Sequence, residues 1–306
     1  MVIYEEDDFK RFVAKIDEEG REVFDYSALA EEFDLTAEGI TGFLGVFEGT
    51  HFKKIILQGL DTSEIMNMNR TFRDCPNLES VDLKNLDLSK VEYMDSLFSG
   101  CSSLKEINLS GLNVPSLRHM YGMFCDCENL KTVDLSDFYV PGVKWLCQIF
   151  ANCKSLVSVN LSNFNARRVD STKDMFSNCK SLTHLDLSNF NVLNLNNADR
   201  MFHDCLSLQV VSLAEDSEVI RSELESELPS VNIISGDMSD YLASNTINES
   251  NVNAFFREGL EELFTKHSIQ YKDLEDVYKM MHEIIQDECK QSKLNNSGAF
   301  QTTSMF

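Results

Sequence analysis

The chain of 306 residues is 43% hydrophobic and strongly acidic, with a formal net charge of −23 at pH 7. Its length suits one main domain with small end modules, and no stretch approaches the roughly 20 consecutive apolar residues of a membrane-spanning helix. The charge disfavours nucleic acid and acidic membranes as partners and favours a protein partner with a basic or polar surface.

The acidity is concentrated in the two ends of the chain. Residues 1–48 hold 14 acidic and 4 basic side chains, residues 49–213 hold 18 and 16, and residues 214–306 hold 18 and 7. The middle of the chain is therefore nearly balanced, and steering of a basic partner is expected from the flanks.

The first 48 residues are predicted to form a helical N-terminal cap. An apolar stripe at helical spacing consists of Phe9, Phe12, Val13 and Ile16. The run 28–44 superficially resembles a helix-turn-helix, but its second helix, 36–47, carries no Lys or Arg, so DNA binding is not expected. The chain starts without the basic and apolar regions of a signal peptide, which predicts a cytoplasmic protein or one exported without such a signal.

A phenylalanine then returns every 26 residues, and a cysteine follows each one three positions later. The phenylalanines are Phe72, Phe98, Phe124, Phe150, Phe176 and Phe202, and the cysteines are Cys75, Cys101, Cys127, Cys153, Cys179 and Cys205. Such a period predicts a solenoid of stacked units that share one continuous core.

Each unit is predicted to contain a strand, a turn and a short helix. The strand is indicated by the i, i+2 spacing of Leu185 and Leu187. The helix is indicated by an i, i+3, i+6, i+7 stripe that consists of Val91, Met94, Leu97 and Phe98. The fold class is thus α/β, a solenoid with a parallel sheet.

The repeat resembles the BspA-like class of leucine-rich repeat, whose units carry the pattern Met-Phe-x-x-Cys-x-Ser-Leu. The resemblance covers roughly residues 50–213, and it implies a leucine-rich-repeat solenoid. Many members of this class are surface proteins, so the absence of a signal peptide departs from the pattern. In the first rung, Gly49 stands where the cysteine is expected.

The cysteine column is predicted to be buried and structural, because it lies beside the Phe and Leu core positions and free cysteine behaves as a small hydrophobe. The regular spacing spreads the thiols along a line, which disfavours a zinc site.

The repeat ends after Leu213. We expect a helix over 216–228 and a strand over 231–234, which close the solenoid domain of residues 49–235. Residues 236–290 are then predicted to form a helical hairpin with two apolar faces, and residues 291–306 a disordered tail.

The sequence offers little catalytic chemistry, and no cofactor, metal ligand or catalytic residue is predicted. The histidines form no metal-binding pattern, and phosphate-loop and nucleophile-elbow motifs are missing. A cysteine nucleophile is the remaining enzymatic alternative, with Cys289 near His282 outside the repeat column and the pair Cys125 and Cys127 within the repeats.

Two surfaces are candidate partner-binding sites. A polar ladder on the sheet face consists of Asp82, Asn108, Asp134, Asn160 and Asp186. A ring-bearing ridge on the other side of the units consists of Tyr93, His119 and Trp145, which share one repeat position. Exposed aromatic clusters are enriched at binding hot spots.

The sequence therefore predicts non-enzymatic protein–protein recognition by an adaptor, effector or inhibitor. Two alternatives stay open, an enzyme or toxin with a cysteine nucleophile outside the repeat column and a structural, self-assembling repeat protein. Iodoacetamide labelling separates the enzyme from the binder, and light scattering separates the assembling protein from the monomer.

Overall fold

The computed structural model describes residues 2–235, except 4, 34, 38–39, 84–85, 111, 137, 139, 162–163, 165–166, 191, 193 and 216. Residues 1–238 form one compact unit. The predicted hairpin of 236–290 and the tail of 291–306, with His282 and Cys289, lie outside the described residues.

The N-terminal segment contains two helices and packs against the first turn of the solenoid. Its elements are β1 (Val2–Ile3), α1 (Glu6–Glu18), β2 (Val23–Asp25), α2 (Tyr26–Phe33) and β3 (Thr36–Ala37). The predicted stripe of α1 is buried, and the Phe9 ring lies 5.5 Å from that of Phe43. The run 28–44 is no helix-turn-helix, because β3 follows α2 directly. A capping role for this segment stays a prediction.

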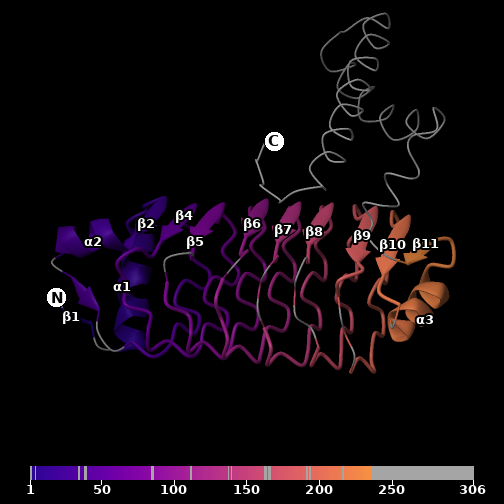
Figure 1. Ribbon diagram of the computed structural model, residues 1–306. Coiled ribbons are helices and arrows are strands. Elements are labelled where there is room, and N and C mark those ends of the chain that lie inside the picture. Colours follow the sequence, from indigo (N-terminus) through magenta and orange to yellow (C-terminus); the bar gives the residue numbers. More distant parts are fainter. Residues whose placement is uncertain are drawn as a thin grey trace, which may run out of the picture. The chain divides into compact units, whose positions relative to one another are not determined.

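Parallel strands, one from each unit, form the sheet side of the solenoid (Figure 1). In the described part of the chain they are β4 (Lys54–Ile56), β5 (Ser80–Asp82), β6 (Glu106–Asn108), β7 (Thr132–Asp134), β8 (Ser158–Asn160), β9 (His184–Leu187) and β10 (Val210–Leu213). Their register follows the repeat, so that Val133 pairs with Ile107 on one side and Val159 on the other. Helix α3 (Glu218–Glu227) and strand β11 (Asn232–Ser235) follow, as predicted to within about two residues.

The short helix predicted in each unit is wrong, and the described repeats between α2 and α3 contain no helix. Backbone N–H groups there donate to the next turn rather than along a helix, as Met94 does to the His119 oxygen at 2.8 Å and Phe98 to the Met123 oxygen at 2.8 Å. Left-handed residues such as Ser96 (φ 54°) and Asn152 (φ 62°) also interrupt any helical path. The fold is therefore a parallel β-solenoid with helices only at the ends of the described unit.

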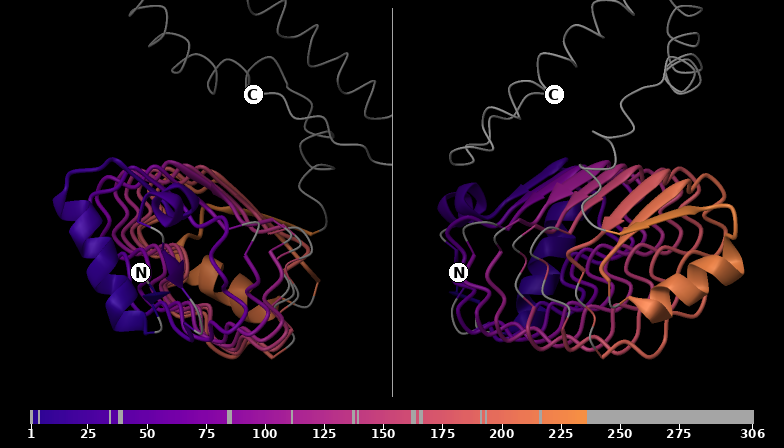
Figure 2. Two further views of the ribbon diagram at one scale, coloured as in Figure 1. Left: turned by 90° about the vertical axis from the view of Figure 1, so that its left-hand side faces the viewer. Right: turned by 45° about the vertical axis from the view of Figure 1, so that its right-hand side comes forward.

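The core is a column of stacked phenylalanine rings. Seen along the stack, the turns superpose around this shared interior (Figure 2). The column comprises Phe47, Phe72, Phe98, Phe124, Phe150, Phe176 and Phe202, whose successive ring centroids lie 5.3–6.0 Å apart. Because each ring packs on the next turn, no unit has a complete core of its own.

The predicted cysteine column is buried, and its thiols are not bridged. Each Sγ donates to the carbonyl oxygen of a phenylalanine one turn earlier, at 2.9–3.2 Å. Burial raises the pKa of the Cys127 and Cys153 thiols well above the ordinary value. The column therefore ties neighbouring turns together, and burial favours the protonated thiol at Cys127 and Cys153.

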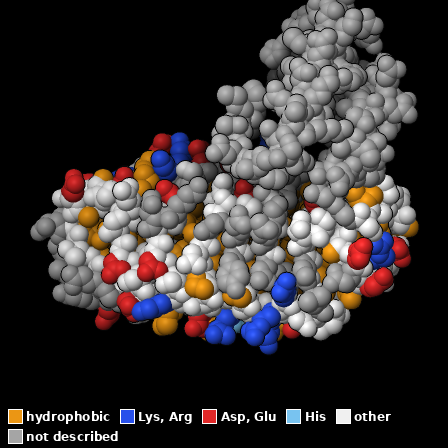
Figure 3. Space-filling view, viewed as in Figure 1, with side chains coloured by type: hydrophobic (Ala, Val, Ile, Leu, Met, Phe, Trp, Pro, Cys, Tyr) orange, Lys and Arg blue, Asp and Glu red, His pale blue; other side chains and the backbone are white. Residues whose placement is uncertain are grey.

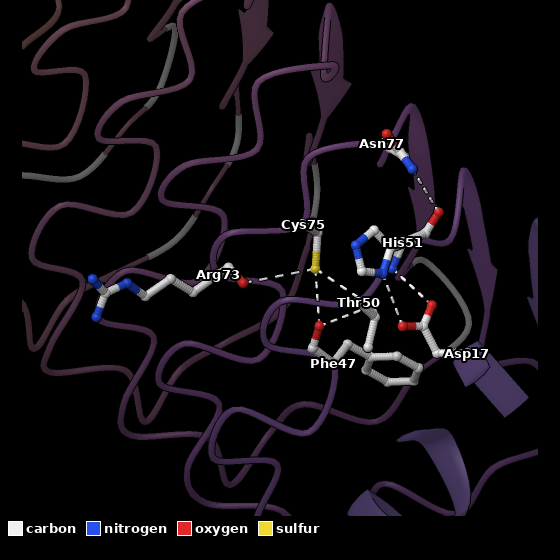
Figure 4. Close-up of polar contacts among 7 residues, drawn as sticks. All are labelled: Asp17, Phe47, Thr50, His51, Arg73, Cys75 and Asn77. Atoms are coloured by element: carbon white, nitrogen blue, oxygen red, sulfur yellow. Dashed lines mark hydrogen bonds and ion pairs between the residues drawn. The ribbon is translucent and has the colours of Figure 1, made fainter. Parts of the chain in front are cut away.

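The residue that replaces cysteine in the first rung is Thr50, and the assignment to Gly49 is wrong. The Thr50 hydroxyl donates to the Phe47 oxygen at 2.9 Å and lies 3.6 Å from Cys75 Sγ, which donates to the same oxygen (Figure 4). The first rung is one residue shorter than the others, because Gly42 pairs with Asn67. A fixed 26-residue step therefore points to the wrong position.

The strand ladder of the sheet is interrupted twice. Its hydrogen-bonded groups are β2-β4-β5, β6-β7-β8 and β9-β10-β11. Among the described strands, β5 and β6 are not joined to each other, and the same holds for β8 and β9. We call the first interruption the β5/β6 seam.

Candidate interaction surfaces

The ring-bearing ridge is present as a continuous stack on three successive turns. The Tyr93 and His119 rings lie 4.9 Å apart and nearly parallel, at 16°. The His119 and Trp145 rings are 5.8 Å apart and inclined at 51°. A parallel β-bridge joins Tyr93 to His119, so backbone pairing rather than a helix places the rings side by side. Trp145 is 46% exposed, whereas the other two rings are half-buried.

A fourth ring beside the ridge was missed by the sequence reasoning. Tyr121 is 46% exposed, and its hydroxyl donates to Gln148 Oε1 at 2.6 Å. It follows His119 by two positions, and residues two apart in an extended segment point to the same side. The available signal was this i, i+2 relation, which the helical interpretation hid. The Tyr121 N–H also donates to Asp95 Oδ1 at 2.7 Å, which fixes the backbone there.

The polar ladder has a structural role that the sequence did not reveal. Asn108 Oδ1 accepts hydrogen bonds from the Ser110 N–H at 2.9 Å and from the Ser110 hydroxyl at 2.7 Å. Asp134 accepts one from the Ser136 N–H at 2.8 Å, and Asp186 accepts one from the Ser188 N–H at 2.9 Å. These are Asx turns, which end strands β6, β7 and β9 and start the corner that follows. The ladder thus shapes the backbone as well as the surface.

A groove runs across the sheet face where this ladder lies. It has a volume of about 960 Å³, and its lining extends from β5 to β8 and includes the acidic residues Glu79, Asp82, Glu106 and Asp134. The remaining lining is made of short polar and aliphatic side chains, among them Asn108 and Asn160. The groove is therefore open to solvent, and its acidic side chains make it negatively charged.

Cys125 and Cys147 are the described cysteines outside the column, and the surroundings of Cys125 do not suit a nucleophile. Cys125 Sγ lies 3.3 Å from Asp126 Oδ2, and burial together with the Asp126 charge raises the pKa of Cys125 to about 12. Cys147 Sγ donates to Ser171 Oγ at 3.3 Å. A reactive thiol needs a lowered pKa, so this arrangement favours inert cysteines.

The described residues contain neither a metal-binding cluster nor a membrane-spanning helix. No three or more His, Cys, Asp or Glu side chains of that part gather closely enough to hold a metal ion. None of the described helices combines the length and apolarity needed to span a bilayer.

In-register parallel strands, a stacked phenylalanine core and polar outer turns define a repeat protein of the leucine-rich type. The chain belongs to the family described as "Mycoplasma protein of unknown function, DUF285", whose profile matches residues 30–138 and 118–223. The predicted kinship with BspA-like repeats is confirmed at this level.

Solved structures with a related repeat include two bacterial proteins. A leucine-rich repeat protein from Bacteroides ovatus is 22% identical with a TM-score of 0.35, and the match covers 66% of this chain and 60% of that one. The T. pallidum leucine-rich repeat protein TpLRR is 19% identical with a TM-score of 0.27, with 53% and 58% covered. This chain therefore spans less than two thirds of either protein. No curated protein matches the sequence significantly.

Proposed function

We propose that this chain is a non-enzymatic protein-recognition module, an adaptor, effector or inhibitor that binds a protein partner through the outer surface of its repeats. The observation that carries the proposal is the ring stack of Tyr93, His119 and Trp145. Repeat proteins often use the extended surfaces of their solenoids for such binding.

The ridge has the properties of a preorganised binding surface. Stacking and a backbone bridge hold the Tyr93 and His119 rings together, and the tilted Trp145 ring lies 5.8 Å from that of His119. A partner that covers Trp145 therefore gains contact area with a large ring while little side-chain freedom is lost. The high pKa of Cys125 supports recognition over catalysis within the repeats.

The test is to isolate the natural partner by pull-down, purify the complex and measure its affinity by calorimetry. Trp145→Ala should weaken binding by at least about 2 kcal/mol, because truncation of a central aromatic anchor has this effect. Leu206→Ala is the matched control, since Leu206 is 75% exposed but lies off the ridge. Urea unfolding of each variant shows whether the fold is kept.

A partner whose affinity is unchanged by both Trp145→Ala and Tyr93→Ala would contradict the ridge as the binding site. The sheet-face groove is the second candidate, favoured by its acidic lining of Glu79, Asp82, Glu106 and Asp134. Such a groove suits the basic or polar partner expected from the net charge, and Glu79→Lys with Glu106→Lys would then weaken binding.

A further inference from the structure

The Trp145 end of the ridge carries a local charge opposite to that of the whole chain. Arg118 and Lys144 are exposed and directly precede His119 and Trp145. Arg118 and Arg168 together line a shallow surface hollow beside Pro141. Figure 3 shows Lys and Arg side chains gathered along the lower edge of the view, beneath strands β6 to β8.

Further cationic charge follows on the next turn. Ser171 is joined to Trp145 by a parallel bridge, and Lys173, two residues later, is exposed. A chain with a net charge of −23 thus carries four cationic side chains on the turns of His119, Trp145 and Ser171, the middle of which holds its single tryptophan.

The acidic residues near the ridge do not cancel this charge. Glu92 Oε2 lies 3.8 Å from Arg118 Nε, with Arg118 exposed and Glu92 partly exposed, so this long, solvated pair contributes little. Glu92 and Asp95 belong to the Tyr93 end of the ridge. At the Trp145 end, Asp170 is half-buried, and its N–H donates to the Lys144 carbonyl oxygen at 2.8 Å. The ridge is therefore polarised, with its cationic end at Trp145.

The packing of the rings indicates which anionic macromolecule this surface suits. Single-stranded nucleic acids bind by stacking bases on free aromatic faces. Here the Tyr93 and His119 rings stack face to face at a centroid distance of 4.9 Å, so the two facing ring surfaces are covered. A base inserted between two rings would need roughly 7 Å or more between them. The surfaces that remain for a partner are the ring edges and the exposed part of Trp145, and these suit contact with aliphatic side chains.

From this combination we propose that the Trp145 end of the ridge binds an acidic, extended protein segment. Carboxylates of the segment pair with Lys144 and Arg168, and an apolar side chain of the segment covers Trp145. The inference rests on the proposed function and names its partner class. Successive turns lie about 5 Å apart, so a segment that runs along the ridge meets one ring per one or two residues.

The experiment selects short random peptides, displayed on phage, against the full chain and then measures the best peptide by fluorescence anisotropy. Enriched peptides should be acidic with an apolar residue. The double variant Lys144→Glu with Arg168→Glu should bind the selected peptide at least tenfold more weakly, and so should Trp145→Ala. Lys180→Glu, a charge reversal at another exposed lysine, should bind like the wild type. Affinity should also fall as salt rises from about 0.05 M to about 0.5 M.

The outcomes separate this inference from the proposed function. Enriched peptides that are neutral or basic, yet weakened by Trp145→Ala, would overturn the acidic partner and leave the ridge as a protein-binding site. Peptides indifferent to Trp145→Ala, or no enrichment at all, would count against both. Tighter binding of oligothymidylate or of phosphatidylserine vesicles, dependent on Lys144 and Arg168, would assign the patch to nucleic acid or membrane instead.

Discussion

Replacement of Cys153 tests whether the thiol column holds the turns together. Cys153 is fully buried, and its Sγ donates to the Phe124 carbonyl oxygen at 3.1 Å. The same oxygen accepts the Cys127 N–H at 3.2 Å. Cys153→Ala therefore leaves this carbonyl paired, and its cost is the lost packing of one sulfur atom, about 1 kcal/mol.

Cys153→Ser should be the more damaging change. The C–O bond is shorter than the C–S bond, so the hydroxyl lies farther from the Phe124 oxygen and its hydrogen bond is stretched. A buried hydroxyl without a good partner costs about 1–3 kcal/mol, which is the expected loss. Cys147→Ser is the matched control, because Cys147 is only partly buried.

Urea unfolding of the full chain, followed by far-ultraviolet circular dichroism, measures these differences. The transition slopes should match, so that the midpoints report stability alone. Iodoacetamide labelling with mass spectrometry should find Cys153 protected in the native state, because burial raises the pKa of its thiol. The reasoning is refuted if Cys153→Ser is as stable as the wild type, if Cys153→Ala is the less stable of the two, or if Cys153 labels quickly.

Three further outcomes are expected in urea unfolding experiments. Burial raises the pKa of Asp95, so the native state holds its proton more tightly than the unfolded chain, and stability is lost as pH rises through the native pKa. Asp95→Asn keeps an oxygen for the Tyr121 N–H; its midpoint should exceed the wild-type midpoint at about pH 7, and the gain should shrink toward about pH 4. Phe124→Ala should cost about 3–5 kcal/mol, and Phe202→Ala less, because Phe202 stacks on one neighbouring ring of the column instead of two. A chain that ends at Met238 should still unfold in one cooperative transition, since residues 1–238 form one compact unit, and loss of that transition would refute this.

Much of the stack could be predicted because the repeat is regular. The 26-residue period places equivalent residues side by side, so the strand register, the buried thiols and the adjacency of Tyr93, His119 and Trp145 follow from counting. The burial of Ile55 and Leu57 in the first rung also agrees with the phase.

The missing helices could not be predicted from apolar spacing alone. Val91, Met94, Leu97 and Phe98 all point inward, but a coil that turns corners produces the same spacing as two turns of a helix. The supposed helix contains a left-handed position, where Ser96 and its equivalents in other turns have positive φ, but residue types such as Ser96 and Gln148 do not reveal it in the sequence. Hydrogen bonds between successive turns favour the coiled path over a helix. These bonds depend on how the turns stack rather than on the helix propensity of the residues in one turn.

The candidate surfaces were predicted in part. The 26-residue spacing predicted that the three rings of the ridge lie side by side. It did not predict Tyr121 or the cationic side chains near Trp145, because these occupy other positions of the repeat. For the ladder, the Asx turns of Asn108 and Asp134 depend on the corner that follows each strand, which the alternation of the strand does not encode.

The β5/β6 seam has a mechanical consequence. On the sheet side β5 and β6 belong to separate hydrogen-bonded groups, whereas on the opposite side the same two turns are joined by the bonds of Met94 to His119 and Phe98 to Met123. Bending that separated β5 from β6 would therefore break no strand pair among the described residues, whereas separating the same turns on the opposite side would break these bonds. Since the groove lining includes both β5 and β6, bending of this kind would change the width of the groove more than the spacing of the Tyr93 and His119 rings.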